Sequence, residues 1–382
     1  MINLFVKSLT LLEKNEIKKF YTLSILTIIA FILETASIGS IIPMLIFLTE
    51  SQSNFYLFEN LIFIENLNYE QKLNIFIIIF LSLFLIKNFY LIFFNWYQNK
   101  FSAQLALNLS SKLFQKYLNQ PYLFFIKNNS AKLIRNIMRE TERFSTNVIV
   151  TNANLILEIL VMVSISIILF LYDPKSFIFV TAISIFSFLL LSLLTRRKLI
   201  AWAKDRTVYE AKVINKLQVS FSLYKVIKVF FKNDIFNKNY FVNMKKYNHA
   251  IRNIFFITKI PRHSFEIVAV FSLSILIFFL TSQNNKIDEL LVLLGLFAAA
   301  AFRILPAVVR IVTSVQSIQS NTPSIKILLT ELKRKDLNKQ YLNKSDPIKF
   351  EKKITLKNII FKYPETNNNV LKDLNLEIKK NE

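Results

Sequence analysis

The stretch that decides the fold is Asp288–Gln319, DELLVLLGLFAAAAFRILPAVVRIVTSVQSIQ. It has no charge between Glu289 and Arg303, and at about 1.5 Å of rise per residue a helix of this length crosses a hydrocarbon layer about 30 Å thick. One helical face collects small, polar and cationic residues, namely Gly295, Ala299, Arg303, Pro306, Arg310, Ser314 and Ser317. A guanidinium inside a membrane costs several kcal/mol unless it meets protein, an anion or water. We therefore predict that this face lines an interior cavity or meets a partner.

The composition of the whole chain indicates a polytopic membrane protein. Of 382 residues, 53% are hydrophobic, and the apolar residues come in separate blocks of membrane-spanning length. The net charge of +23 lies between these blocks, as the positive-inside rule expects, and no compact basic domain or aromatic RNA motif accompanies it. Nucleic acid is therefore not an expected partner. There is no Cys, and two His are too few for a metal cluster.

The apolar blocks predict six membrane spans with both termini in the cytoplasm. Residues 1–19 have the pattern of an amphipathic helix on the membrane surface. The spans are expected at about 20–48, 73–97, 147–171, 175–195, 254–280 and 288–318. The acidic segment 50–71 lacks Lys and Arg and is placed outside, whereas the long basic loops 98–146 and 196–252 are placed inside. The sequence Tyr172–Lys175 predicts a tight outer turn between the third and fourth spans.

The period of the sequence changes near the C-terminus. Residues 331–347 are charged and nearly free of large apolar side chains, so they are interpreted as a linker. Residues 348–382 alternate like two strands around the turn PETNNN, and two or three strands do not bury a core alone. The fold class expected is thus an all-α membrane protein with six transmembrane helices and long cytoplasmic helical extensions, followed by the first β-strands of a truncated soluble domain.

This organisation resembles the ABC exporters, whose six-span domain is fused to a cytoplasmic ATP-binding domain. The resemblance assigns residues 20–330 to the transmembrane domain and 348–382 to the start of the ATP-binding domain, with Tyr363 of FKYP at the position that stacks on adenine. It implies ATP with Mg²⁺ as cofactor and a homodimer as the assembly. The phosphate-binding loop G-x-x-x-x-G-K-[ST] is not present, because the only glycines are Gly39 and Gly295. We therefore expect no catalytic residues and no ATP hydrolysis by this chain alone.

Three short segments are similar to the flippases that move lipid-linked oligosaccharides across the bacterial inner membrane. They are ETASIGSIIPMLIFLT from Glu34, PRHSFE from Pro261 and FRILPAVVRIVTS from Phe302. The resemblance implies an amphipathic, phosphate-bearing substrate in contact with membrane lipids. Two alternatives stay open: a peptide or multidrug exporter, and a non-catalytic membrane subunit that works with an ATP-binding domain on another chain.

Four cations lie within or near the predicted spans: Lys87, Arg262, Arg303 and Arg310. A diphosphate lipid needs compensating positive charge to cross a low-dielectric layer, and guanidinium groups offer bidentate contacts. The flippase resemblance places the first three of these residues in the translocation cavity. The alternative is ion pairing with the intramembrane acids Glu34, Glu158 and Glu266, and Arg262 has the four-residue spacing of a helical pair with Glu266.

Two aromatic segments in the basic loops resemble the coupling helices on which ATP-binding domains dock. The first is Pro121–Phe125, with Tyr122, Phe124 and Phe125, and the second falls near Leu217–Lys228, with Leu223 and Tyr224. Ordinary packing within the loops is the alternative, because aromatic residues are abundant throughout the chain.

Overall fold

The computed structural model describes residues 10–40, 69–172, 174–281, 306–334, 350, 352–363 and 368–381. The chain divides into two compact units. The helical unit comprises Met1–Leu118 and Tyr122–Lys335, and the second unit comprises Asn119–Pro121 and Asp336–Glu382. Each unit is described by itself.

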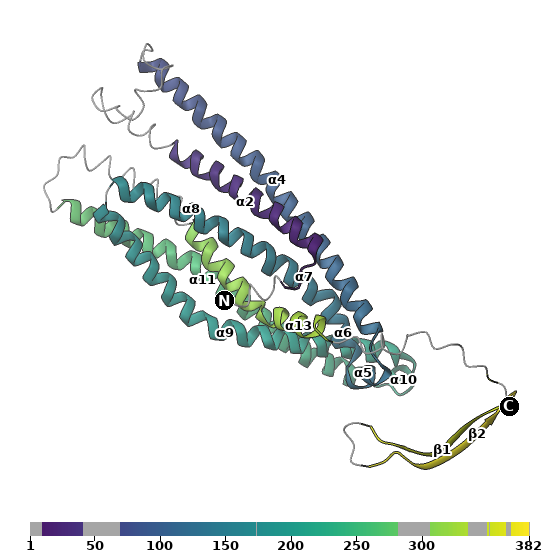
Figure 1. The fold of residues 1–382 in the computed structure, drawn as a ribbon. Helices are drawn as coiled ribbons and strands as arrows, with labels where there is room; N and C mark the ends of the chain where they lie inside the picture. Colours follow the sequence, from purple (N-terminus) through teal and green to yellow (C-terminus); the bar gives the residue numbers. More distant parts are fainter. Residues whose placement is uncertain are drawn as a thin grey trace. The chain divides into compact units, whose positions relative to one another are not determined.

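The first described helix, α2, runs from Lys14 to Gly39 and packs against α4 and α8, whose bounds are given below (Figure 1). Its first turn is capped by Glu16, whose Oε2 accepts a hydrogen bond from the backbone N–H of Glu13 at 2.8 Å. Leu23 and Ala30 are fully buried. The surface amphipathic helix predicted for residues 1–19 falls partly outside the described residues, and its last six residues are the start of α2 rather than a separate helix.

Helix α4 is a single rod of 50 residues, Tyr69–Leu118. Its N-terminal part presents large apolar side chains outward, including Phe89 at 71% exposed and Ile92 at 67% exposed. Its C-terminal part turns Phe101, Leu105, Leu109 and Leu113 inward, at the spacing of one helical face. The second predicted span and the start of the first basic loop are therefore one continuous helix.

A chain of short helical segments follows and leads into the third span. These are α5 (Tyr122–Lys127), α6 (Ser130–Arg135), the π-helical turn η1 (Asn136–Glu140), α7 (Thr141–Phe144), the π-helical turn η2 (Ser145–Val150) and α8 (Thr151–Tyr172). The Asn129 side chain caps α6 by accepting from the N–H of Ala131 at 2.8 Å. The first basic loop, 98–146, is therefore mostly helical as predicted, and the π turns η1 and η2 lie at its end.

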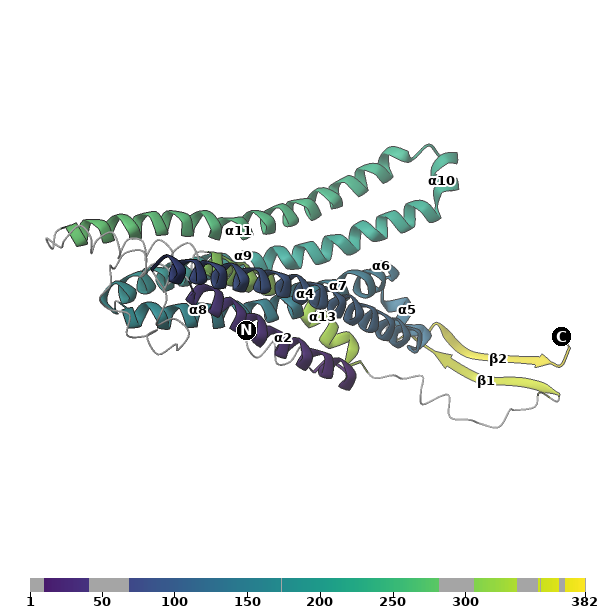
Figure 2. The same ribbon diagram turned by 90° about the horizontal axis from the view of Figure 1, so that it is seen from above.

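The next three elements form a long antiparallel pair with a short helix at its tip. They are α9 (Pro174–Ser222), α10 (Tyr224–Val229) and α11 (Asn233–Thr281). Helix α8 ends at Tyr172 and Pro174 occupies the first position of α9, while Asp173, in the middle of the predicted tight turn, lies outside the described residues. Leu199 and Ala203 of α9 are buried with Ile254 and Ile257 of α11. Figure 2 shows the two rods joined at the α10 end.

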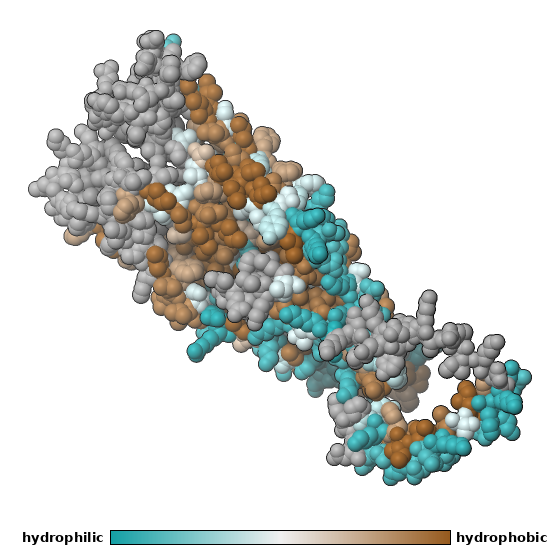
Figure 3. Space-filling model, in the orientation of Figure 1, coloured by the Kyte–Doolittle hydropathy of each residue, from teal (hydrophilic) through white to brown (hydrophobic). Residues whose placement is uncertain are grey.

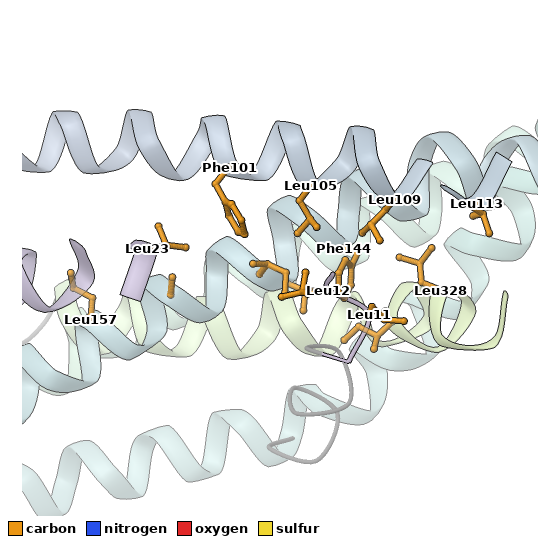
Figure 4. Close-up of a cluster of buried hydrophobic side chains, with 14 of the residues drawn as sticks. Leu11, Leu12, Leu23, Phe101, Leu105, Leu109, Leu113, Phe144, Leu157 and Leu328 are labelled. Carbon is orange, nitrogen blue, oxygen red and sulfur yellow. The ribbon is translucent and has the colours of Figure 1, made fainter. Parts of the chain in front are cut away.

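The last helical part of the unit begins at Pro306, where residues 306–320 form a helix, and α13 (Thr322–Leu332) follows it. Ile325 and Leu328 of α13 join the main core beside Leu113 of α4 and Phe144 of α7 (Figure 4). This core extends from Ala30 of α2 and Ile165 of α8 to Leu113 of α4 and Phe124 of α5. It ties the segment after the sixth span to the first basic loop.

Within the described residues, three helical stretches are long and apolar enough to cross a membrane: Lys14–Ser37, Ile77–Leu118 and Ser130–Ile167. They overlap the first three predicted spans, and residues 41–48 of the first lie outside the described residues. The predicted fourth and fifth spans fall on α9 and α11, and the described part of the sixth is residues 306–318. Figure 3 shows apolar side chains gathered on one half of the unit, with hydrophilic side chains toward the α5 end. We call the part that contains Glu34, Lys87, Glu158 and Arg310 the apolar half. The part toward α5 and α10, which contains residues 135–143 and 206–252, is called the polar half.

The second unit contains two antiparallel strands, β1 (Lys353–Phe361) and β2 (Leu371–Lys379), as the alternation predicted. The pairing runs from Lys353 opposite Lys379 to Phe361 opposite Leu371, with irregularities on both sides of Ile359. None of the strand residues is buried. The hairpin therefore has no core of its own within the described residues.

Candidate functional site

The helix 306–320 carries a charged residue that faces the third span. Arg310 forms a bidentate ion pair with Glu158 of α8: Nε and Nη2 each donate to one carboxylate oxygen, with Nη2 to Oε2 at 3.1 Å. The arginine side chain is 44% exposed and the glutamate only 8% exposed. Solvent therefore reaches the Arg310 side of the ion pair, whereas Glu158 is buried.

The opposite side of the same helix is packed. Val308 and Val312 are buried together with Phe265 of α11. Farther along, Gln316 is buried, and its Nε2 donates to Thr195 Oγ1 of α9 at 3.4 Å. The helix therefore has one apolar seam toward α9 and α11 and a polar side that bears Arg310, as the spacing of Asp288–Gln319 predicts for this part of the span.

Lys87 of α4 is buried, and its Nζ lies 4.0 Å from the centre of the Phe84 ring, one turn away. Glu34 of α2 is buried as well. Both predicted intramembrane charges of this helix pair thus lie inside the helical unit rather than on its surface.

Arg262 lies on the exposed side of α11. Its Nε is 3.1 Å from Oε1 of Glu266, and the two side chains are 71% and 54% exposed. His263 Nδ1 lies 3.4 Å from the other oxygen of Glu266. The structure therefore contains the ion pair that the four-residue spacing suggests. The remaining predicted cation, Arg303, lies outside the described residues.

The two predicted coupling segments fold as short helices at the same end of the unit (Figures 1 and 2). In α5, Phe124 is buried against Tyr117, with ring centres 5.6 Å apart, while Tyr122 is 78% exposed and Phe125 is 42% exposed. The guanidinium of Arg334, just after α13, lies over the Phe124 ring at 4.9 Å. One aromatic residue thus anchors α5, and two face outward.

Helix α10 shows the same division with less anchoring. Ile227 is buried, whereas Leu223 and Tyr224 are 42% and 57% exposed. After the helix, Phe231 is 87% exposed and has a positive φ of 51°. A non-glycine residue in this region is uncommon and holds its side chain away from the helix. Together, α5 and α10 present apolar side chains of the kind that another protein domain covers.

Tyr363 follows β1 in the second unit. Its ring is 5.1 Å from that of Phe361, edge to face, and it is 38% exposed. The ring face is therefore partly open to a flat ligand such as adenine. The residues present do not fit the phosphates or Mg²⁺, because the chain has no glycine-rich loop, and no group of three His, Asp or Glu in the described part of the chain is placed to hold a metal.

An ionic cluster in the polar half was not anticipated from the sequence. Its ion pairs join Arg135 and Arg143 with Glu140 and Glu210, Arg139 lies at its edge with Nε 3.9 Å from Glu210 Oε1, and Arg206 feels the charge of both carboxylates. Arg143 donates to both oxygens of Glu210 at 2.7 and 3.0 Å, and its Nη1 lies 3.4 Å from Glu140 Oε1. Arg135 Nε lies 3.3 Å from the same Glu140 oxygen. Glu140 is fully buried.

Arg206 adds a further buried arginine beside these groups. Its Nη2 donates to the backbone oxygen of Ser320 at 3.1 Å and lies 3.3 Å from Asn321 Oδ1, which connects α9 to the end of helix 306–320. Burial lowers the pKa of Arg206 to about 10, because a charged guanidinium is poorly solvated there. The sequence shows only that Glu140 and Arg143 are three residues apart. It does not show that Arg143 also contacts Glu210, which lies on another helix.

These features define a class of protein: a helical membrane domain in which one helix carries a half-exposed cation, with two short helices, α5 and α10, that expose apolar side chains at its polar end. A family model, described as the ABC transporter transmembrane region, matches residues 22–305. The chain belongs to this family.

A solved structure gives the same fold. The structure titled "Structure of a bacterial Atm1-family ABC exporter with ATP bound" superposes with a TM-score of 0.69 at 9% sequence identity. The match covers 96% of this chain and 61% of that exporter, so this chain spans less than two thirds of its length. The predicted fold class is confirmed: the chain has the ABC exporter transmembrane fold, with two strands at the C-terminal end.

Proposed function

We propose that the chain is the membrane subunit of an ATP-driven exporter that moves an amphipathic, phosphate-bearing substrate, such as a lipid-linked oligosaccharide, across the bacterial inner membrane. The observation that carries the proposal is Arg310, a cation on a polar helix face that is 44% exposed within a membrane domain. A phosphate group that approaches this side meets a guanidinium held in place by Glu158. Buried Lys87 adds a second positive group in the apolar half.

The energy would come from an ATP-binding domain that docks on α5 and α10, either in the same protein or on another chain. The exposed Tyr122, Phe125 and Tyr224 support such docking, because they place apolar area at the polar end of the rods. A second copy of the chain would complete the cavity, and both termini would lie in the cytoplasm. Tyr363 would stack on adenine in the complete ATP-binding domain.

A peptide or multidrug exporter is the second candidate. It is favoured by the ion pairs of Arg310 with Glu158 and of Arg262 with Glu266, because compensated cations attract an anionic substrate less strongly than free ones. The two candidates thus differ in one contact. In the first, Arg310 binds the substrate phosphate as well as Glu158, whereas in the second it binds only Glu158.

The test compares a polyprenyl diphosphate with the corresponding uncharged polyprenol, both titrated onto the chain in lipid nanodiscs. The proposal expects the diphosphate to bind about tenfold or more tightly than the alcohol, because a bidentate charged contact contributes about 1.5–3 kcal/mol. Arg310→Gln should abolish the difference. Arg252→Gln, an exposed arginine in the polar half, is the matched control and should leave it unchanged.

Equal binding of the two lipids, or an unchanged preference in Arg310→Gln, would contradict the substrate class. Tighter binding of a hydrophobic peptide or dye than of either lipid would favour the second candidate. Stimulation of ATP hydrolysis by the same ligands, measured with the ATP-binding domain present, then tests transport coupling.

A further inference from the structure

The helix that leads into the third span contains two π-helical turns, η1 and η2, on either side of α7. The backbone stays helical across their boundaries, with φ and ψ of −57° and −45° at Arg135 and −61° and −35° at Thr151. A π turn accommodates about one extra residue, and one residue corresponds to a rotation of about 100° in an α-helix. Loss or movement of a π turn therefore turns α8 relative to α6 without breaking the rod.

The ionic cluster sits on this stretch. Arg135 precedes η1, Glu140 ends it, and Arg143 lies in α7 between the two π turns. All three residues make their charged contacts in the register that the π turns create: Arg135 and Arg143 meet the same oxygen of Glu140 at 3.3 and 3.4 Å. A rotation of about 100° on one side of η1 would separate these groups.

The cluster also connects the π turns to two other parts of the unit. On one side, Asn136 of η1 donates to the hydroxyl of Tyr117 at 3.0 Å, and Tyr117 packs on Phe124 of α5. On the other side, Arg206 binds the backbone of Ser320 at the end of helix 306–320. Arg135 joins the two sides, because its Nη2 donates to Asn136 Oδ1 and its Nη1 donates to the backbone oxygen of Thr207, the neighbour of Arg206 in α9, both at 2.6 Å. Contacts through the α9 backbone thus connect α5 with the end of the helix that carries Arg310.

We propose that η1 and η2 form a rotary hinge at the base of the third span, and that the ionic cluster is the lock that holds this hinge in one register. The inference rests on the proposed function, in which α5 is pushed by a docked domain. Displacement of α5 would move Tyr117 and Asn136, break the contacts of Glu140, and let α8 turn, which would carry Glu158 away from Arg310.

Burial makes the lock all-or-none. A buried ion pair resists partial separation, because each charge left without its partner in a low-dielectric interior costs several kcal/mol. Glu140 Oε2 and Arg206 Nε already lack a hydrogen-bond partner among the described residues. The ion pairs therefore hold the cluster in one arrangement, but not every buried polar atom has a hydrogen-bond partner, as expected for a contact that must open.

The test uses the absence of Cys in the chain. Ser145→Cys places a near-isosteric thiol at a fully buried position in η2, and Thr146→Cys places one at the adjacent exposed position. The thiols are reacted with a water-soluble maleimide in nanodiscs, without nucleotide or substrate. Glu140→Gln should raise the labelling rate at position 145 by about tenfold or more, toward the rate at position 146.

Glu142→Gln is the matched control. It removes the same charge two residues away, from a side chain that is 57% exposed, and should leave the rate unchanged. Arg143→Glu should also raise labelling at position 145, because it places a like charge beside both Glu140 and Glu210, whereas Arg143→Lys, which keeps a positive charge beside both carboxylates, should raise it less. This second series decides the question if Glu140→Gln does not fold.

Unchanged labelling in both Glu140→Gln and Arg143→Glu, or an equal rise in Glu142→Gln, would overturn the lock. The measurement needs neither ATP nor cargo. A positive result therefore stands even if the lipid-binding test fails, and a negative result leaves the proposed substrate class untouched.

Discussion

The apolar and polar halves of the helical unit hold charge in different ways. In the apolar half, Arg310 has one carboxylate partner, Glu158, and remains 44% exposed. In the polar half, Arg143 contacts two carboxylates and is 14% exposed, and the fully buried Glu140 contacts two arginines.

The difference separates charges that stabilise the fold from a charge that a ligand can reach. A pair that is open on one side can exchange its partner at modest cost, whereas a closed cluster loses several contacts together. The apolar half therefore offers a cation to a ligand, and the polar half uses its cations to join helices. Three substitutions test this comparison.

The largest effect is expected for Glu210→Ala in the polar half. It leaves Arg143 buried without its bidentate partner, and breaking a buried ion pair costs about 3–5 kcal/mol. The measurement is the free energy of unfolding in detergent, followed by tryptophan fluorescence. A loss below about 1 kcal/mol would show that the cluster does not stabilise the fold.

Glu158→Gln in the apolar half should have an intermediate effect. Arg310 loses its charged acceptor but keeps solvent access on one side, so we expect a loss of about 1.5–3 kcal/mol at most, the contribution of a hydrogen bond to a charged group. The same unfolding assay applies. A cost as large as that of Glu210→Ala would mean that the two halves hold charge alike.

The smallest effect is expected for Glu142→Gln. Its ion pair with Arg139 spans 3.5 Å between side chains that are 57% and 56% exposed, so removal should change the free energy of unfolding by less than about 0.5 kcal/mol. A larger loss in the unfolding assay would place Glu142 in the ionic cluster.

The sequence predicted those features that depend on neighbours along the chain. The strands β1 and β2 follow a simple period, and the Arg262–Glu266 pair, which the sequence offered as the alternative to a cavity site for Arg262, joins residues four apart. The positions of α5 and α10 came from a resemblance, and the structure shows short helices there.

The remaining features depend on contacts between distant helices. Arg310 and Glu158 are 152 residues apart, and Arg143 and Glu210 are 67 apart, so spacing along one helix does not reveal either pair. The sequence places the basic loops in the cytoplasm but does not show which of their charges are buried, and Glu140 is fully buried. The π turns were also missed, because a single extra residue hardly disturbs an apolar pattern that is read over a whole helix.

The uninterrupted length of α4 has a mechanical consequence. A rod of 50 residues is about 75 Å long, and its lower part is clamped by Leu105, Leu109 and Leu113 in the main core. Since no joint separates its two parts, a tilt of about 5° around that clamp would sweep the far tip through several ångströms. A small rotation near the core is thereby converted into a larger displacement at the far end of the helix.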